Sequence, residues 1–154
     1  MDSNLLLLLV VGSASVTYIE KHKRLSGTYS QEDFLTLGKI ISEFSDIVSI
    51  PHTLTEVSNL GRQIDNPARR LILAGLKEFI STTLESNIPS ILGTRRSEFE
   101  SFGLTVSVLL HLCTLTLNGI VPTLVTVDTA LANAALSLGY SVIDFKRDFQ
   151  RSVG

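Results

Sequence analysis

The sequence predicts an α/β fold in which helices cover both faces of a central, mainly parallel sheet, giving a three-layer α/β/α sandwich. Three short runs rich in β-branched residues indicate buried strands, at residues 47–50, 124–127 and 141–145. Helical patterns of ten or more residues separate them, and such crossovers join parallel strands. With 154 residues, 44% of them hydrophobic, the chain is predicted to form one compact domain over residues 1–154.

The apolar run from Leu5 to Val11 fits a buried strand, a buried helix or the core of a leader peptide. No Lys or Arg precedes the run, which argues against a leader peptide. It is also far shorter than the ~20 residues that a membrane-spanning helix needs, so we expect no membrane segment. A single cysteine, Cys113, excludes an internal disulfide and fits the reducing cytoplasm.

Helix start signals and apolar residues at helical spacing predict the remaining helices. One begins at Ser30, a second follows the strand at residues 47–50, and a third runs from Pro67 to about Leu84. The segment 102–117 alternates like a strand at its start, but its length favours a helix. The remaining segments are an irregular or short extended stretch, a charged surface and a small-residue helix, at residues 89–93, 95–100 and 129–138.

Carboxylates stand where strands of this sheet are predicted to end. Asp128 directly follows the strand at residues 124–127, Glu56 comes shortly after the strand at residues 47–50, and Asp2 precedes the first apolar run. Ligands of parallel sheets bind beyond the carboxyl ends of the strands, and converging carboxylates suit Mg²⁺ or Mn²⁺. Each acid also has a purely structural interpretation, because Asp128 fits a helix N-cap and Glu56 a first turn favoured by the helix dipole.

Four segments resemble successive motifs of PIN-domain proteins, in order over nearly the whole chain: Asp2 to Leu6, Pro51 to Leu60, Phe102 to Thr105 and Thr126 to Ala132. The resemblance implies the fold of metal-dependent endoribonucleases, which serve as toxins of toxin–antitoxin pairs and as RNA-processing enzymes. It implies catalytic and metal-holding roles for Asp2, Glu56 and Asp128, with Asn4 and Thr126 in support. It also implies that Asp2 ends a first strand and that the apolar run after it is a helix.

The sequence departs from the family pattern in two places. Val106 stands where the family usually carries an Asp that binds the metal, and only Met1 precedes Asp2 in place of a longer first strand. Thr105 and Ser107 offer hydroxyl groups beside Val106, but neither restores the negative charge. Two hypotheses follow: a Mg²⁺- or Mn²⁺-dependent ribonuclease in which a metal-bound water attacks the phosphodiester, or a degenerate PIN-like protein that binds RNA or a protein partner.

Basic residues are the expected contacts for RNA phosphates. They gather in short runs: Lys21, Lys23 and Arg24, then Arg69 and Arg70, then Arg95 and Arg96. A solvated surface is the ordinary explanation for any one pair, and the net charge of -2 argues against a surface that is basic throughout. The resemblance further implies a homodimer and an antitoxin partner. No metal-ligand spacing is formed by His22, His52 and His111.

Overall fold

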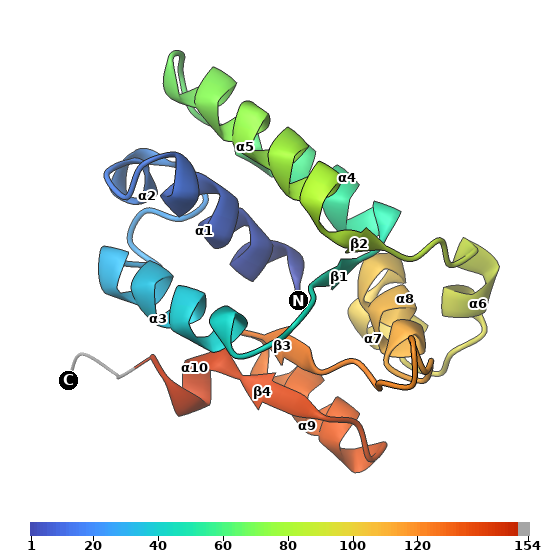
Figure 1. Ribbon diagram of the computed structural model, residues 1–154. Coiled ribbons are helices and arrows are strands. Elements are labelled where there is room, and N and C mark those ends of the chain that lie inside the picture. The colour runs from blue at the N-terminus through green and yellow to red at the C-terminus, as the bar shows by residue number, and fades with distance from the viewer. Residues whose placement is uncertain (151–154) are drawn as a thin grey trace.

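The computed structural model describes residues 1–150, and over these residues the chain is a mixed α/β protein with ten helices and two short parallel sheets (Figure 1). In one sheet, β1 (Val48–Ser49) pairs with β2 (Leu84–Glu85). In the other, β3 (Leu124–Thr126) pairs with β4 (Val142–Asp144). The predicted α/β class and the parallel pairing are therefore confirmed, whereas the described residues form two separate pairs of strands and no continuous central sheet.

Five helices in the first half of the chain surround the largest core. They are α1 (Ser3–Ala14), α2 (Tyr18–Lys21), α3 (Gln31–Ser42), α4 (Pro51–Gly61) and α5 (Ala68–Thr82). Helix α1 is the centre of this group, since Leu5, Leu6, Leu7 and Leu8 are all buried. Burial on every side explains why the first apolar run has no polar face.

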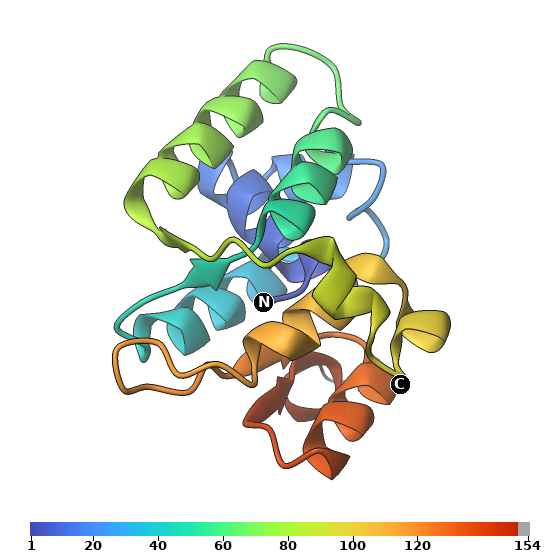
Figure 2. The same ribbon diagram turned by 90° about the vertical axis from the view of Figure 1, so that its right-hand side faces the viewer.

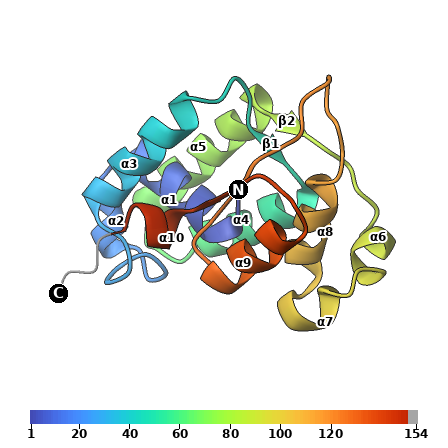
Figure 3. The same ribbon diagram turned by 90° about the horizontal axis from the view of Figure 1, so that it is seen from below.

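Three of the other helices build a second group around α8 (Leu104–Leu112). They are α6 (Ser90–Thr94), α7 (Phe99–Phe102) and α9 (Thr129–Ser137), whereas α10 (Phe145–Asp148) packs through Phe145 against the core of the first group. Helices α6, α7 and α8 lie on the side of the strands opposite to α1, α2 and α3 (Figures 1 and 3), and Figure 2 looks onto this second group. Two smaller apolar clusters, around Leu109 and around Leu110, join α8 to the strands.

The helix predicted at Ser30 is confirmed together with its start signal. The side chain of Ser30 accepts a hydrogen bond from the Asp33 N–H at 3.2 Å, and the Asp33 carboxylate accepts one from the Ser30 N–H at 2.8 Å. This reciprocal pair satisfies two N–H groups that the helix itself leaves unbonded.

Three local predictions are wrong. Residues 90–94 form helix α6, where an irregular or extended segment was expected. Gly93 lets this helix pack closely on α8, because a Cβ there would lie 2.7 Å from a Val108 methyl group. The long helix predicted over residues 102–117 ends at Leu112 and is separated from α7 by Gly103, whose φ of 81° favours glycine. Leu84, expected to end a helix, belongs to β2 because it pairs with Val48 of the neighbouring strand β1, which is distant in the sequence.

Among the ten described helices, none combines the length and the apolar character that crossing a bilayer demands.

Candidate functional site

Asp2 joins the beginning of α1 to the end of β3. Its N–H donates to the Val125 carbonyl at 3.0 Å, and its Oδ1 accepts from the Leu5 N–H at 3.0 Å. Its Oδ2 accepts from the Thr126 hydroxyl at 2.6 Å and from the Val127 N–H at 2.8 Å. The carboxylate is buried, and both of its oxygens are occupied by hydrogen bonds that hold the backbone in place.

Asp128 caps helix α9. Its Oδ1 accepts a hydrogen bond from the Leu131 N–H at 3.0 Å, which is an N-cap interaction. Its own N–H donates to the Thr126 hydroxyl oxygen at 3.1 Å. Thr126 therefore stands between two of the predicted acids and bonds to both, as its place two residues before Asp128 suggests.

Glu56 lies on the exposed side of α4 and connects three helices. Its Oε1 accepts from the Thr105 hydroxyl of α8 at 2.8 Å, and its Oε2 accepts from the Ser3 hydroxyl of α1. Helix α4 begins at Pro51, so Glu56 is beyond the first turn and outside the reach of the helix dipole. Hydrogen bonding to neighbouring helices fixes this carboxylate.

These contacts bring the predicted acids to one end of the molecule. We call this group the rim cluster, and it consists of Asp2, Ser3, Glu56, Thr105, Thr126 and Asp128. The cluster forms where β1 and β3 end and where α1, α4 and α9 begin. The spacing of the acids along the sequence is thus consistent with a shared location, and the hydroxyl groups of Ser3, Thr105 and Thr126 connect them.

The rim cluster does not have the ligand set of a divalent metal site. Val106 is half-buried against the apolar cluster of α8 and α9, and Ser107 is fully buried with its hydroxyl unpartnered, so neither adds a charge. Hard divalent cations need several free oxygen ligands, whereas the Asp2 oxygens already accept three hydrogen bonds. Over residues 1–150, no three His, Cys, Asp or Glu side chains converge to hold an ion. The residues present therefore do not fit Mg²⁺ or Mn²⁺.

The basic residues that were expected to contact RNA phosphates lie in different environments. Arg24 donates through Nε to the Asn4 Oδ1 at 3.3 Å, which places it beside the start of α1. Arg95 is exposed. Arg96 is largely buried, where it pairs with Glu98 at 3.3 Å and donates to the Tyr140 hydroxyl at 3.2 Å. Arg96 therefore supports α7 and is poorly placed to contact a phosphate.

Lys21 and Lys23 line a cavity of about 380 Å³, which we call the basic pocket. Arg62 and Arg69 line it from the opposite side, and Asp65 is the one acidic residue in its wall. The ion pairs found within residues 1–150 are Arg96–Glu98 and Arg147–Asp148, so the four cations of the pocket have no carboxylate partner there. The sequence pointed to Lys21, Lys23 and Arg69, but Arg62 lies some forty residues away from the lysines and gave no local signal.

His22 holds the two sides of the basic pocket together. It is fully buried, its Nε2 lies 2.9 Å from the Leu60 carbonyl near the end of α4, and its Nδ1 accepts from the Arg24 N–H at 3.1 Å. This pattern assigns the proton to Nε2 and leaves the ring neutral. Burial lowers the pKa of His22, against the opposing effect of the Leu60 carbonyl. The segment that carries Lys21 and Lys23 is thereby fixed to α4.

Comparisons with protein-family models, with curated proteins and with solved structures give no match to this chain. The chemistry of its own residues is therefore the basis for inferring its function.

Proposed function

We propose that this protein is a three-layer, PIN-like α/β module that binds single-stranded RNA through its basic pocket and holds no catalytic metal. The observation that carries the proposal is the set of four cations without carboxylate partners around one cavity. Together with Asp65 they give the pocket wall a formal charge of +3, four positive charges less one, in a protein whose net charge is -2. Phosphate contacts of this kind supply most of the affinity in sequence-independent RNA binding.

Two further features of the pocket suit a nucleic acid. Helix α5 begins at its wall, and no side chain caps the first turn, so the positive end of the helix dipole favours a phosphate there. Tyr18 also lines the pocket and is half-buried, which gives one aromatic face for stacking with a base. Charge and stacking surface thus occur in the same cavity.

The state of the rim cluster supports a binding protein over a nuclease. Asp2, Glu56 and Asp128 connect α1, α4, α8, α9 and β3 through hydrogen bonds, which is a structural task. The three-layer arrangement is supported by parallel strand pairs that lie between two groups of helices (Figure 3). In this proposal the acids of the rim cluster serve as structural links between the strand ends and the helices.

The proposal is tested by the binding of a fluorescent single-stranded 20-mer RNA, followed by anisotropy in EDTA at several salt concentrations. The double variant Lys21→Glu with Arg62→Glu removes two pocket cations. We expect it to weaken binding at least tenfold and to lower the salt slope by about 1.4, since each phosphate contact to a single strand contributes about 0.7. The matched control is Lys39→Glu with Lys77→Glu, which makes the same charge change at exposed positions outside the pocket.

Equal loss of affinity in both double variants would mean that net charge alone governs binding, and the pocket would have no special role. Incubation of the unmodified protein with the same RNA and Mn²⁺ is a second test, which distinguishes a nuclease from a binding protein. If the RNA is cut, and the cut is lost in Asp128→Asn, the ribonuclease hypothesis replaces this proposal.

A further inference from the structure

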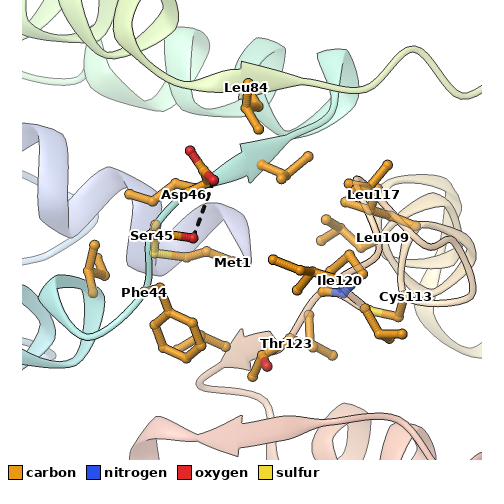
Figure 4. Close-up of a pocket in the computed structure, with 18 of the residues that line it drawn as sticks. Met1, Phe44, Ser45, Asp46, Leu84, Leu109, Cys113, Leu117, Ile120 and Thr123 are labelled. Atoms are coloured by element: carbon orange, nitrogen blue, oxygen red, sulfur yellow. Dashed lines mark hydrogen bonds between the residues drawn. The ribbon is translucent and has the colours of Figure 1, made fainter.

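A second cavity, of about 210 Å³, lies between the two small sheets, and we call it the slot (Figure 4). Its walls come from β1, β2, β3, the end of α3, helix α8 and the loop after it, and they are mostly apolar. Four large hydrophobic side chains of its lining are strongly exposed to solvent: Phe44 at 41%, Leu84 at 45%, Val121 at 53% and Ile120 at 62%. An exposed apolar surface of this kind marks an interaction site.

Backbone groups of both sheets face the slot. In β1, the carbonyls of Ile47 and Ser49 accept hydrogen bonds from β2 and the residue after it, at 3.0 and 2.8 Å. In β3, the Leu124 N–H donates to the Ser141 carbonyl beside β4 at 2.9 Å. The direction of the peptide groups alternates along a strand. The peptide groups of Val48, after Ile47, and of Val125, after Leu124, therefore point away from the paired strand and toward the slot. Both residues line the slot.

The first residues of the chain already begin to pair with β3 inside the slot. The Asp2 N–H donates to the Val125 carbonyl, and the Asp2 carboxylate accepts from the Val127 N–H in the place that a backbone carbonyl takes in a parallel ladder. In a parallel ladder, the Val125 N–H would then bond to the carbonyl two positions before Asp2. That position is the one directly before Met1.

The Met1 nitrogen itself is poorly suited to be a free amine. It lies within the slot lining and is buried, and this burial lowers the pKa of the α-amine, against the opposing effects of Asp2 and Cys113. A buried ammonium group is costly unless it is paired. A peptide N–H at the same place carries no charge.

We propose that the slot seats one extended apolar strand joined by a peptide bond to the nitrogen of Met1, running parallel to β1 and β3. The two small sheets then become one parallel sheet in the order β2, β1, inserted strand, β3, β4. This inference concerns the fold and its completion and does not depend on RNA binding.

The walls of the slot define the strand that fits. One face would meet Ile41 and Phe44 of the α3 side, and the other would meet Leu109 and Leu112 of α8. A parallel strand covered on both faces is apolar at consecutive positions. Strands of globular proteins commonly have about five or six residues, so a strand of that length is the expected occupant.

The test compares two chains extended at the N-terminus. One carries Lys-Lys-Val-Ile-Val-Ile-Val ahead of Met1, and the other carries Lys-Lys-Gly-Ser-Gly-Ser-Gly, where the lysines keep both soluble. We expect the apolar extension to raise Tm by roughly 5–10 °C and to slow amide hydrogen exchange at Val48 and Val125 at least about tenfold. The Gly-Ser extension is expected to leave both unchanged.

Two outcomes would overturn the proposal. One is equal Tm and equal exchange rates in the two extended chains. The other is that the separate peptide acetyl-Val-Ile-Val-Ile-Val-amide raises the Tm of the unextended chain and slows its amide exchange as much as the attached strand does. The slot would then receive a strand from another molecule. Size-exclusion chromatography separates a filled slot from association of the extended chain, because only association changes the elution volume.

Discussion

At the scale of single residues, Val106 has the most informative position in the molecule. It follows Thr105, whose hydroxyl donates to Glu56, and it packs in the cluster that contains Leu131 of α9, one turn from Asp128. A carboxylate at this position would add to the rim cluster the negative charge that a divalent cation requires.

We therefore expect Val106→Asp to create a metal site. Addition of 1 mM Mn²⁺ should raise the Tm of this variant by about 3 °C or more, since a ligand that binds the folded state stabilises it. Val106→Asn has the same shape without the charge and should show no Mn²⁺ effect. A Tm shift of the same size in the unmodified protein would contradict our conclusion that its rim cluster does not fit the ion.

His22 makes stability depend on pH. Because burial lowers the pKa of His22 below the ordinary histidine value of 6.5, the unfolded chain binds the proton more readily, and stability falls as the pH drops below that value. The stabilisation is present above pH 6.5 and is lost through the lower, folded pKa. Between pH 7 and pH 5, Tm should fall by roughly 2–4 °C more in the unmodified protein than in His22→Gln, as followed by circular dichroism.

His111→Gln is the matched control for this experiment, because it removes a histidine without touching His22. It should keep the pH dependence of the unmodified protein. Identical pH profiles for the unmodified protein and His22→Gln would show that His22 does not carry the effect.

At the scale of elements, the glycines of α1 and α3 distinguish packing from helix propensity. A Cβ at Gly12 of α1 would overlap the ring of Phe34 in α3, whereas a Cβ at Gly38 of α3 would meet no atom within 4 Å. Gly12 therefore allows the close approach of the two helices. Gly38 only weakens its own helix.

Opposite results are expected from the same substitution at these two positions. Gly38→Ala should raise the free energy of unfolding by about 0.5–1 kcal/mol through helix propensity, and Gly12→Ala should lower it by about 1–3 kcal/mol through overpacking. Urea denaturation measures both. A stabilising Gly12→Ala would mean that Phe34 moves aside freely and that the contact does not set the helix spacing.

At the scale of the whole molecule, the chain is organised around α1 and the two strand pairs. The rim cluster closes the carboxyl ends of β1 and β3, and the slot separates the same two strands along their length. The basic pocket is formed elsewhere, by α2, the segment after it, and the connection from α4 to α5. RNA binding and completion of the sheet can therefore be tested independently.

The sequence by itself determined most helices and the parallel α/β class. The capping pair of Ser30 and Asp33, the proline at the start of α4 and the apolar run of α1 are local features, since their bonds join residues only a few positions apart. The same locality predicted that Asp128 could cap α9. Strand β2 was missed because its pairing with β1 joins residues 36 positions apart, as 84 less 48.

Only the tertiary structure decided how the polar groups are used. The bonds of Glu56 to Ser3 and Thr105, and of Asp2 to Thr126, join residues 49 to 124 positions apart. The grouping of Lys21 and Lys23 with Arg62 and Arg69 arises in the same way. Packing brings residues that are distant in the sequence together through contacts among many side chains at once. Sequence patterns, in contrast, report the hydrogen bonds within one helix or one turn.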